Sequence, residues 1–497
     1  MPHSPYSSAA VWLGACLLFC GSVMGHAQGD DDPPLTLQLA EAVALAQTES
    51  PGAAFAATRL SNREWQYKSA LADFKPQVNL TGTLPQLNRS IQPITLPNGE
   101  QAFIPQALMT NEVGVSLSQV VGRLGGQVFV NSGLQRLDIF KQDNQAGRTS
   151  YLSTPISVGY QQNLSGYNPF RWQRELAPLR YEEAQLAFNE QREDLALQAA
   201  QRYFGVLSAQ LNLEAARVRQ VNADTLLGVS EGRYSVGRIA ETELLQIELA
   251  ALNAVTEVES ARVRLRRDSE ALRNLLGLPA GTTFALAAPV DLPALDVNLD
   301  TALHYARANR SEILGFRRRM LEAEEDYVRA RADNGIQGDL FVRFGLAGSA
   351  GTVGDALTEP LDNQLLTLGL SVPIADFGKR RARLEVARSN RDLERLSIEQ
   401  ERTSLEQNVE LLVRQFDLLR NNVGLAERAY EASERALDIT RKRYLIGKIG
   451  ITQLNLSIQE QDKARLLYLS ALRDFWIGYY ELRLNTLYDF GQGRSLR

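Results

Sequence analysis

The sequence has almost no cysteine and almost no histidine. Its 497 residues include two cysteines, Cys16 and Cys20, and three histidines. Both cysteines and two of the histidines lie within residues 1–27, which we predict to be a signal peptide, so the mature chain has one imidazole, His304, and no thiol. This excludes disulfides, thiol catalysis and a histidine-based metal site or triad within one chain. We expect His304 to have a structural role on a helix.

The signal peptide is predicted from an apolar block, Ala9 to Val23, followed by Gly25-His-Ala27, a small-x-small pattern suited to signal peptidase. No Lys or Arg precedes this block. A second cleavage site, Leu13-Gly-Ala-Cys16, resembles a lipoprotein box, so lipidation of Cys16 stays open. We favour the cut after Ala27 because Leu17-Leu-Phe19 continues the apolar core.

Long apolar runs are also missing. After residue 27 no stretch reaches the roughly 18 apolar residues that a membrane-spanning helix needs, and the mean hydropathy of -0.22 is compatible with water. The net charge is -5. Arg and Lys are scattered among Glu, as on solvated helix faces, which gives no reason to expect a nucleic-acid partner.

The motifs of an enzyme are absent as well. The sequence has no phosphate-binding glycine loop, nucleophile elbow or metal-ligand spacing. Neighbouring carboxylates such as Glu182/Glu183 and Glu324/Glu325 diverge by about 100° on a helix and do not form a site. We therefore predict no catalytic residue, no metal site and no cofactor.

What the sequence does have is a turn that occurs twice. Gly232-Arg-Tyr-Ser-Val-Gly237 returns 210 residues later as Lys442-Arg-Tyr-Leu-Ile-Gly447. Each turn follows a seam of positions spaced alternately four and three residues apart, which predicts helices packed side by side in a left-handed supercoil. The second seam comprises Leu405, Val409, Leu412, Phe416, Leu419, Val423, Ala426, Tyr430, Ser433, Leu437, Thr440 and Tyr444, and the Ala-rich first seam occupies the positions 210 residues earlier, from Leu195 to Tyr234.

The two helical runs are very long. They extend from about Arg171 to Val236 and from about Arg380 to Ile446, and each reaches roughly 100 Å at 1.5 Å per residue. A hairpin of this length cannot fold into a globule, so we predict two rods that need neighbours.

The segments between the helices alternate instead. In one of them Leu366, Leu368 and Leu370 interleave with Thr367, Gly369 and Ser371, and residues 78–84 and 156–164 follow the same pattern. Strands of about ten residues with one apolar and one small-polar face are typical of a transmembrane β-barrel. A soluble β-sandwich is the alternative, and it is disfavoured because no further set of strands exists to pack against these.

The two halves of the chain are unequal. The helix starts at Leu39 and Leu299 are 260 residues apart and the turns 210, so the first half has about 50 extra residues, which include alternating runs at 112–121 and 126–135. These runs either add strands to the sheet, which we favour, or form a hairpin outside it. The predicted organisation is a first repeat at 28–278 (extra region about 88–150, hairpin 170–276), a linker at 279–298, a second repeat at 299–490 (two strands, hairpin 377–490) and a tail at 491–497.

These features resemble the outer-membrane efflux protein family, the TolC-like channels, over essentially everything after the signal. The likeness lies in the order and duplication of short motifs. They are Leu39-Ala-Glu-Ala-Val-Ala-Leu-Ala46, Arg233-Tyr-Ser-Val-Gly237, Leu275-Leu-Gly-Leu-Pro279, Ser371-Val-Pro-Ile-Ala-Asp-Phe-Gly-Lys-Arg-Arg381 and Arg443-Tyr-Leu-Ile-Gly447.

The resemblance implies an α+β, mainly α fold: a homotrimeric transmembrane β-barrel that continues into a long periplasmic α-helical barrel, built from two internal repeats. Oligomerisation is also expected on physical grounds, because four or six strands per chain cannot close a lumen and open edges cannot face lipid. Three chains give 12 strands, or 18 if the extra pair inserts.

The resemblance further implies a passive duct in the cell outer membrane, joined to a periplasmic adaptor protein and an inner-membrane transporter in a tripartite efflux or type I secretion system. The cargo is not encoded in these motifs. The alternative is a periplasmic coiled-coil adaptor or scaffold, which has long hairpins too; we disfavour it because here the order helix, strand pair, hairpin occurs twice.

Two sites follow from the resemblance. The adaptor is expected to dock at the turns, and Tyr444 is expected to bond to Thr242 or Glu243 as a periplasmic gate, although continued packing in the seam is the alternative for this tyrosine. The family's gate arginine is Ile449 here, and acidic positions of some members are Gln453 and Leu456, so the charged part of the gate is in doubt. The predicted docking residues are Val236, Gly237, Arg238, Ile446, Gly447 and Lys448.

Overall fold

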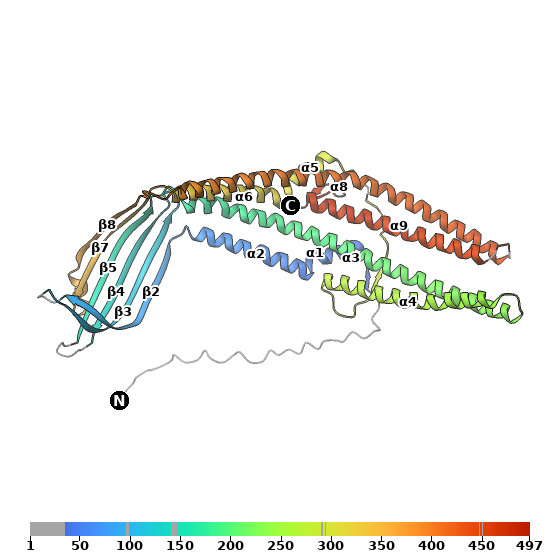
Figure 1. Ribbon diagram of the computed structural model, residues 1–497, viewed down its shortest axis with the longest axis horizontal. Coiled ribbons are helices and arrows are strands. Elements are labelled where there is room, and N and C mark those ends of the chain that lie inside the picture. The colour runs from blue at the N-terminus through green and yellow to red at the C-terminus, as the bar shows by residue number, and fades with distance from the viewer. Residues whose placement is uncertain are drawn as a thin grey trace, which may run out of the picture.

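The chain is elongated, with a β-sheet at one end and the turns of two helical hairpins at the other (Figure 1). The computed structural model describes residues 35–95, 99–140, 147–289, 292–293, 295–446, 448–449 and 451–497. The predicted signal peptide, with both cysteines, lies outside the described residues, as does Gly447.

The two hairpins have the same dimensions. The first consists of α3 (Pro169–Ser235) and α4 (Glu241–Leu276), and the second of α8 (Lys379–Leu445) and α9 (Ile451–Thr486). The first helix of each hairpin has 67 residues and the second has 36. Two pairs of shorter helices lie beside them, α1 (Leu39–Thr48) with α2 (Pro51–Ala72) and α5 (Leu299–Asn309) with α6 (Ser311–Asp333).

Polar side chains and glycines mark the helix ends. The Asn168 side chain accepts hydrogen bonds from the backbone N–H groups of Phe170 and Arg171, 3.1 and 3.2 Å, and so caps α3. Asp376 accepts from the backbone N–H of Arg380, 2.7 Å, in the first turn of α8. Gly277 ends α4 with φ of 72°, the left-handed conformation that glycine adopts without strain.

The predicted seams are the inner faces of the hairpins. Every position of the second seam from Leu405 to Thr440 is buried or half-buried, and the residues between them are largely exposed. In the first seam Arg202 and Tyr234 are exposed, so the stripe is interrupted there. The prediction was wrong at these two positions, because an arginine cannot be buried without a partner and the helix pair ends at Tyr234.

The main hydrophobic core lies where the two hairpins and the short helices meet. Tyr203, Phe204, Phe416 and Phe475 are among its fully buried side chains. The Tyr203 hydroxyl lies within hydrogen-bonding distance of a backbone carbonyl on either side, Leu37 at 2.9 Å and Ala287 at 2.8 Å, and its single proton can be donated to either. Here the predicted linker contains β6 (Phe284–Leu286), which pairs in parallel with β1 (Leu35–Leu37).

One antiparallel sheet of six strands forms the other end of the molecule. Its order is β2-β3-β4-β5-β7-β8, and β2 and β8 are its edges. The strands have 11 to 21 residues, longer than the ten predicted, because β2 and β3 pair far beyond the segment that alternates. The bounds are β2 Gln77–Thr95, β3 Gln101–Val121, β4 Gly126–Ile139, β5 Arg148–Asn163, β7 Gln337–Ala350 and β8 Leu361–Ser371.

The two faces of this sheet differ in chemistry. One cross-strand row is small and polar through all six strands: Asn79, Ser116, Asn131, Ser157, Gly345 and Asn363. The adjacent row is apolar through the first five: Val78, Leu117, Val130, Val158 and Phe344. Neighbouring rows face opposite sides of a sheet. The sheet therefore has one apolar and one polar face, and much of the apolar face, including Val78, Leu80 and Phe344, is exposed in the described part of this single chain.

Helix α7 (Val353–Thr358), between β7 and β8, was not predicted. Ala356 is fully buried against the sheet, and the Ser153 hydroxyl donates to its carbonyl. Gly348 permits this approach, because a Cβ at that position would clash with the same carbonyl oxygen. Elsewhere, no helix within the described ranges combines the length and the apolar character needed to cross a bilayer.

Candidate functional site at the hairpin ends

The turn between α3 and α4 is closed by backbone hydrogen bonds. The N–H of Arg238 donates to the carbonyl of Arg233, 2.9 Å, and Gly237 has φ of 69°. This bond, which spans six residues around a left-handed glycine, is the Schellman type of helix end. Val236, Gly237 and Arg238 are exposed. The turn therefore presents the apolar side chain of Val236 and the basic side chain of Arg238 on either side of the exposed backbone of Gly237.

The turn between α8 and α9 is closed in the same way. The N–H of Lys448 donates to the carbonyl of Arg443, 3.0 Å, and these residues lie 210 positions after Arg238 and Arg233. Ile446 and Lys448 are exposed. Both hairpins thus end in a β-branched residue, Val236 or Ile446, and a basic residue, Arg238 or Lys448, follows two positions later. The docking role of these residues stays a prediction.

The predicted gate residues lie on the first turn of α4 and the last turn of α8. Thr242 and Glu243 are exposed, and Glu241 and Glu243 place two carboxylates at the N-terminus of α4, where the helix dipole favours negative charge. The side chain of Tyr444 lies outside the described part of the structure. Its bond to Glu243 or Thr242 therefore stays a prediction.

A buried ion cluster, not predicted, joins the two hairpins near the middle of the molecule. The Arg483 guanidinium on α9 binds Glu193 on α3, with Nε–Oε2 of 2.9 Å and Nη2–Oε1 of 3.1 Å, and reaches Asp489 at 3.3 Å. The side chains of Arg483, Glu193 and Asp489 are 14%, 7% and 1% exposed. Asp489 also accepts a hydrogen bond from the Tyr479 hydroxyl, 2.8 Å.

Two further ion pairs cross between the hairpins closer to the turns. Arg219 on α3 binds Asp462 on α9, Nη1–Oδ2 3.1 Å, and Arg465 on α9 binds Glu214 on α3, Nη2–Oε2 3.2 Å. Arg219 also holds Glu257 on α4, Nη2–Oε1 2.6 Å. One guanidinium thus contacts carboxylates of both hairpins.

Many helix charges are paired across helices, which the sequence pattern did not predict. Arg318 on α6 binds Glu183 on α3, Nε–Oε2 2.6 Å, while the next residue, Arg319, binds Glu394 on α8, 2.8 Å. The divergence of adjacent helix positions lets α6 hold α3 with one arginine and α8 with the next. The sequence alone does not show which acidic side chain of another helix lies beside each arginine.

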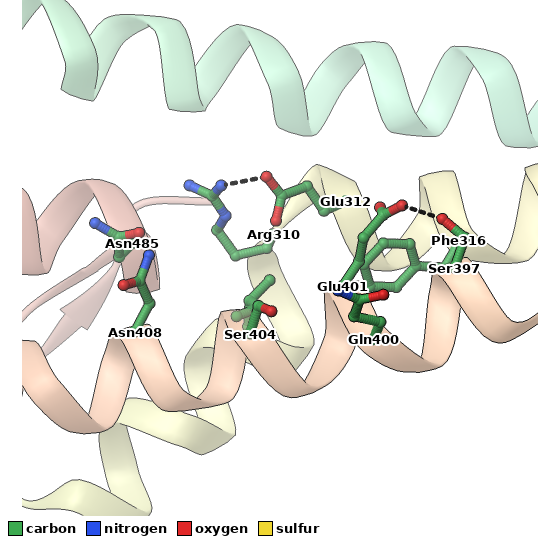
Figure 2. A pocket seen from close by; sticks show the side chains of 10 residues that line it. Arg310, Glu312, Phe316, Ser397, Gln400, Glu401, Ser404, Asn408 and Asn485 are labelled. Atoms are coloured by element: carbon green, nitrogen blue, oxygen red, sulfur yellow. Dashed lines mark hydrogen bonds and ion pairs between the residues drawn. The ribbon is translucent and has the colours of Figure 1, made fainter.

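A polar hollow of about 440 Å³ lies between α6, α8 and the end of α9 (Figure 2). Its charged side chains are already paired: the Arg310 guanidinium with Glu312, 2.9 Å, and Glu401 with the Ser397 hydroxyl, 2.8 Å, and with Arg319. What remains towards the hollow are amides and hydroxyls such as Gln400, Asn408 and Ser404. Within the described ranges, no group of three or more His, Cys, Asp or Glu side chains is placed to hold a metal ion.

Comparison with known proteins gives a family match over part of the chain and a fold over most of it. Residues 302–483 match the family model described as outer membrane efflux protein, which confirms the resemblance. No curated protein matches the sequence.

The fold is that of several solved outer-membrane proteins. The chain superposes on the Campylobacter jejuni CmeC outer membrane channel (TM-score 0.65, 13% identity, 92% of this chain and 86% of that one). It is also similar to a Pseudomonas aeruginosa membrane protein (0.63, 17%, 92% and 92%) and to the outer membrane protein VceC of Vibrio cholerae (0.60, 14%, 92% and 97%).

Proposed function

We propose that this chain, whose residues 302–483 form an outer membrane efflux protein domain, is one subunit of a homotrimeric exit duct in the outer membrane. The sheet of each subunit contributes a third of a membrane barrel, and the hairpins of the three subunits form a tube in the periplasm. The duct has no chemistry of its own. A periplasmic adaptor docks at the hairpin turns, and an inner-membrane transporter supplies the energy.

The observation that carries this proposal is the open two-faced sheet. Six strands of alternating direction leave β2 and β8 antiparallel at the two edges, so β2 of one copy can pair with β8 of the next. Edge strands with unpaired backbone cannot face lipid, and closure through neighbouring copies removes both edges. Three copies give a barrel of 18 strands, with the apolar rows towards lipid and the polar rows towards a water-filled lumen.

The surface and the length of the helices support the periplasmic part. Each 67-residue helix spans about 100 Å, and exposed leucines such as Leu411, Leu418 and Leu425 recur every seven residues along the outside of α8. A second apolar stripe at heptad spacing is suited to packing against a neighbouring helix. In the proposed trimer this neighbour belongs to another subunit.

The proposal is tested with the full-length protein expressed in a Gram-negative host. We expect it in the outer-membrane fraction, as a detergent-stable trimer that conducts ions in planar lipid bilayers. Recovery from the soluble periplasm as a non-conducting protein would favour the alternative, an adaptor or scaffold without a channel.

A further inference from the structure

The segment that joins β8 to α8, residues 372–378, is exposed although it carries large apolar side chains. Ile374 is 94% exposed, and the side chain of Phe377 is fully exposed. Both residues lie where the sheet meets the helices (Figure 1). Contact of a whole aromatic ring with water is unfavourable. We therefore expect a surface outside this chain to cover the ring.

The backbone of the turn keeps Phe377 in this exposed position. Its φ of 53° lies in the left-handed region, which a residue other than glycine rarely adopts. The Asp376 carboxylate fixes the turn, because it accepts hydrogen bonds from the backbone N–H groups of Gly378, 3.2 Å, and Arg380, 2.7 Å. Backbone strain of this kind persists only where surrounding contacts impose it, and it is concentrated at functional sites.

The segment also continues the apolar face of the sheet. On that face of β8, Leu366, Leu368 and Leu370 are 71%, 67% and 70% exposed. Beyond the end of the strand, Val372 and Ile374 keep the same alternation. In the proposed barrel this face is turned towards lipid, so the apolar row reaches the periplasmic boundary of the membrane at Ile374. The aromatic ring follows three residues later, and aromatic side chains are enriched at such boundaries.

Basic side chains follow the segment directly. Lys379, Arg381 and Arg383 are exposed, and no carboxylate within the described ranges forms an ion pair with any of the three. The base between the first two, Arg380, is already paired with Asp376, Nε–Oδ2 2.9 Å. Three positive charges at the start of α8 thus have no counter-ion among the residues that the structure describes.

A hollow of about 510 Å³ lies beside these bases, between the end of α6 and the first turns of α8. Lys379 and Arg383 contribute two positive charges to its wall, and Asp333 contributes one negative charge. The rest of the wall consists of Ala330, Asn334, Ala382 and Val386. The hollow therefore has a positive net charge, and its volume is sufficient for a small polar group such as a phosphorylated headgroup.

A second copy of the chain does not supply the missing negative charge. In the proposed trimer β2 of the next copy lies beside β8, and the charged residues just before β2 are Asp73 and Lys75. Their charges cancel, and Asp73 already accepts a hydrogen bond from the Gln173 amide, 2.9 Å. An anion from outside the trimer is thus the better match for the bases of α8.

We infer that the junction of β8 and α8 binds an anionic glycerophospholipid of the periplasmic leaflet. Ile374 and Phe377 lie among the acyl chains, and Lys379 and Arg383 bind the phosphate at the hollow. A lipid with a net negative charge is preferred over a zwitterionic one, because each base near the surface attracts it. This inference rests on the proposed duct function and adds to it a preference for one class of lipid.

The test uses Phe377→Trp in the full-length protein, reconstituted in vesicles whose brominated acyl chains quench indole fluorescence on contact. Phosphatidylcholine vesicles receive equal amounts of brominated phosphatidylglycerol, which is anionic, or brominated phosphatidylcholine, which is not. Wild type, measured in parallel, accounts for the native tryptophans. We expect quenching by both lipids, with phosphatidylglycerol bound about fivefold more tightly, the effect of about one basic residue near a charged surface. Free phosphate cannot give this signal, because it has no acyl chain.

The bases are tested by adding Lys379→Gln and Arg383→Gln together to this protein. The preference for phosphatidylglycerol is expected to fall to within about twofold, whereas quenching itself remains because the ring still contacts acyl chains. The matched control replaces Arg395 and Arg428 with Gln instead. Both are exposed arginines of the same helix, farther from the sheet, and their loss is expected to leave the preference unchanged.

The outcomes separate this site from the duct function. A Phe377→Trp protein that conducts but is not quenched overturns the site, because protein then covers the ring. Equal preference in the two double variants overturns the role of the two bases. Wild type that neither inserts nor conducts overturns the proposed function.

A second measurement applies if Phe377→Trp alone does not assemble. Native mass spectrometry then compares trimers that keep Phe377, with and without the changes at Lys379 and Arg383. More phosphatidylglycerol retained by wild type than by the double variant supports the site, and equal retention overturns it.

Discussion

Arg483 and Glu193 lie 290 residues apart in the sequence, yet the guanidinium of one and the carboxylate of the other share two hydrogen bonds inside the protein. The pair joins the last helix of the second hairpin to the first helix of the first. Tyr479 and Tyr480 flank the guanidinium, with ring centroids 5.6 and 5.4 Å from its central carbon. The two hairpins are thus fixed to each other at mid-length.

Removing one partner of this pair is expected to be costly. Arg483→Met leaves Glu193, whose side chain is 7% exposed, without its cation. Breaking a buried ion pair typically costs about 3 kcal/mol of unfolding free energy. The measurement is denaturant unfolding of the purified protein. The control is Arg171→Met, which removes the exposed pair with Glu175 and is expected to cost less than about 0.5 kcal/mol; equal losses would contradict a special role of the buried pair.

Stability is expected to fall in strong alkali because of buried tyrosines. Burial raises the pKa of Tyr480 from 10.0 to about 12, and it raises the pKa of Tyr479 too. Between these values the folded chain keeps a proton that the unfolded chain releases. The resulting stability is present in full below about pH 10 and is lost as the pH rises towards about 12.

The variant Tyr480→Phe removes one of these ionisations. We expect its unfolding free energy to decline less steeply than that of wild type above about pH 10, without becoming flat, because Tyr479 remains. The exposed tyrosine at the first turn supplies the control, Tyr234→Phe. A decline that is unchanged in Tyr480→Phe would show that Tyr480 ionises normally in the folded protein.

The predicted gate bond is tested by removing its hydroxyl or its charge. If the Tyr444 phenol donates to Glu243, a charge-assisted bond is lost in Tyr444→Phe and in Glu243→Gln. We expect each to raise single-channel conductance. Glu241→Gln, two positions away on the same helix end, is the matched control. Unchanged conductance in both gate variants would support plain seam packing for Tyr444.

The glycine at the first turn is expected to serve both the fold and the partner. Gly237 has φ of 69°, and a Cβ added there would have no other atom within 4 Å, so Gly237→Ala meets no clash but strains the backbone by about 1 kcal/mol. We expect weaker capture of the periplasmic adaptor by Gly237→Ala in cross-linking. Gly232→Ala, inside α3 with equally open surroundings, should bind as wild type does; equal capture by both would argue against docking at this turn.

The sequence predicted the parts of the fold that repeat. A seam such as Val409, Phe416 and Val423 can be read because heptad spacing reflects contact with one neighbour over many turns. The alternation of Leu366, Leu368 and Leu370 was equally informative, because one face of a strand alternates with the other.

The features that were missed depend on single long-range contacts. Arg483 and Glu193 look like ordinary helix charges until the fold brings α3 and α9 together, and Arg219 has an acidic partner on two different helices. Helix α7 is six residues long and is held by its contacts with Gly348 and Ser153. No periodic pattern reveals such contacts, since each involves one position and not a repeat.

The equal dimensions of the hairpins have a consequence for how their length can change. Because 67-residue helices are matched with 36-residue partners in both, the loss of seven residues from one rod alone withdraws its end by about 10 Å while the other stays in place. Loss of seven residues from each of the four arms preserves the register of every seam, since the stripe returns to the same face after seven positions. The length of the helical part can therefore change without loss of packing only in steps of seven residues, and only when both hairpins change together.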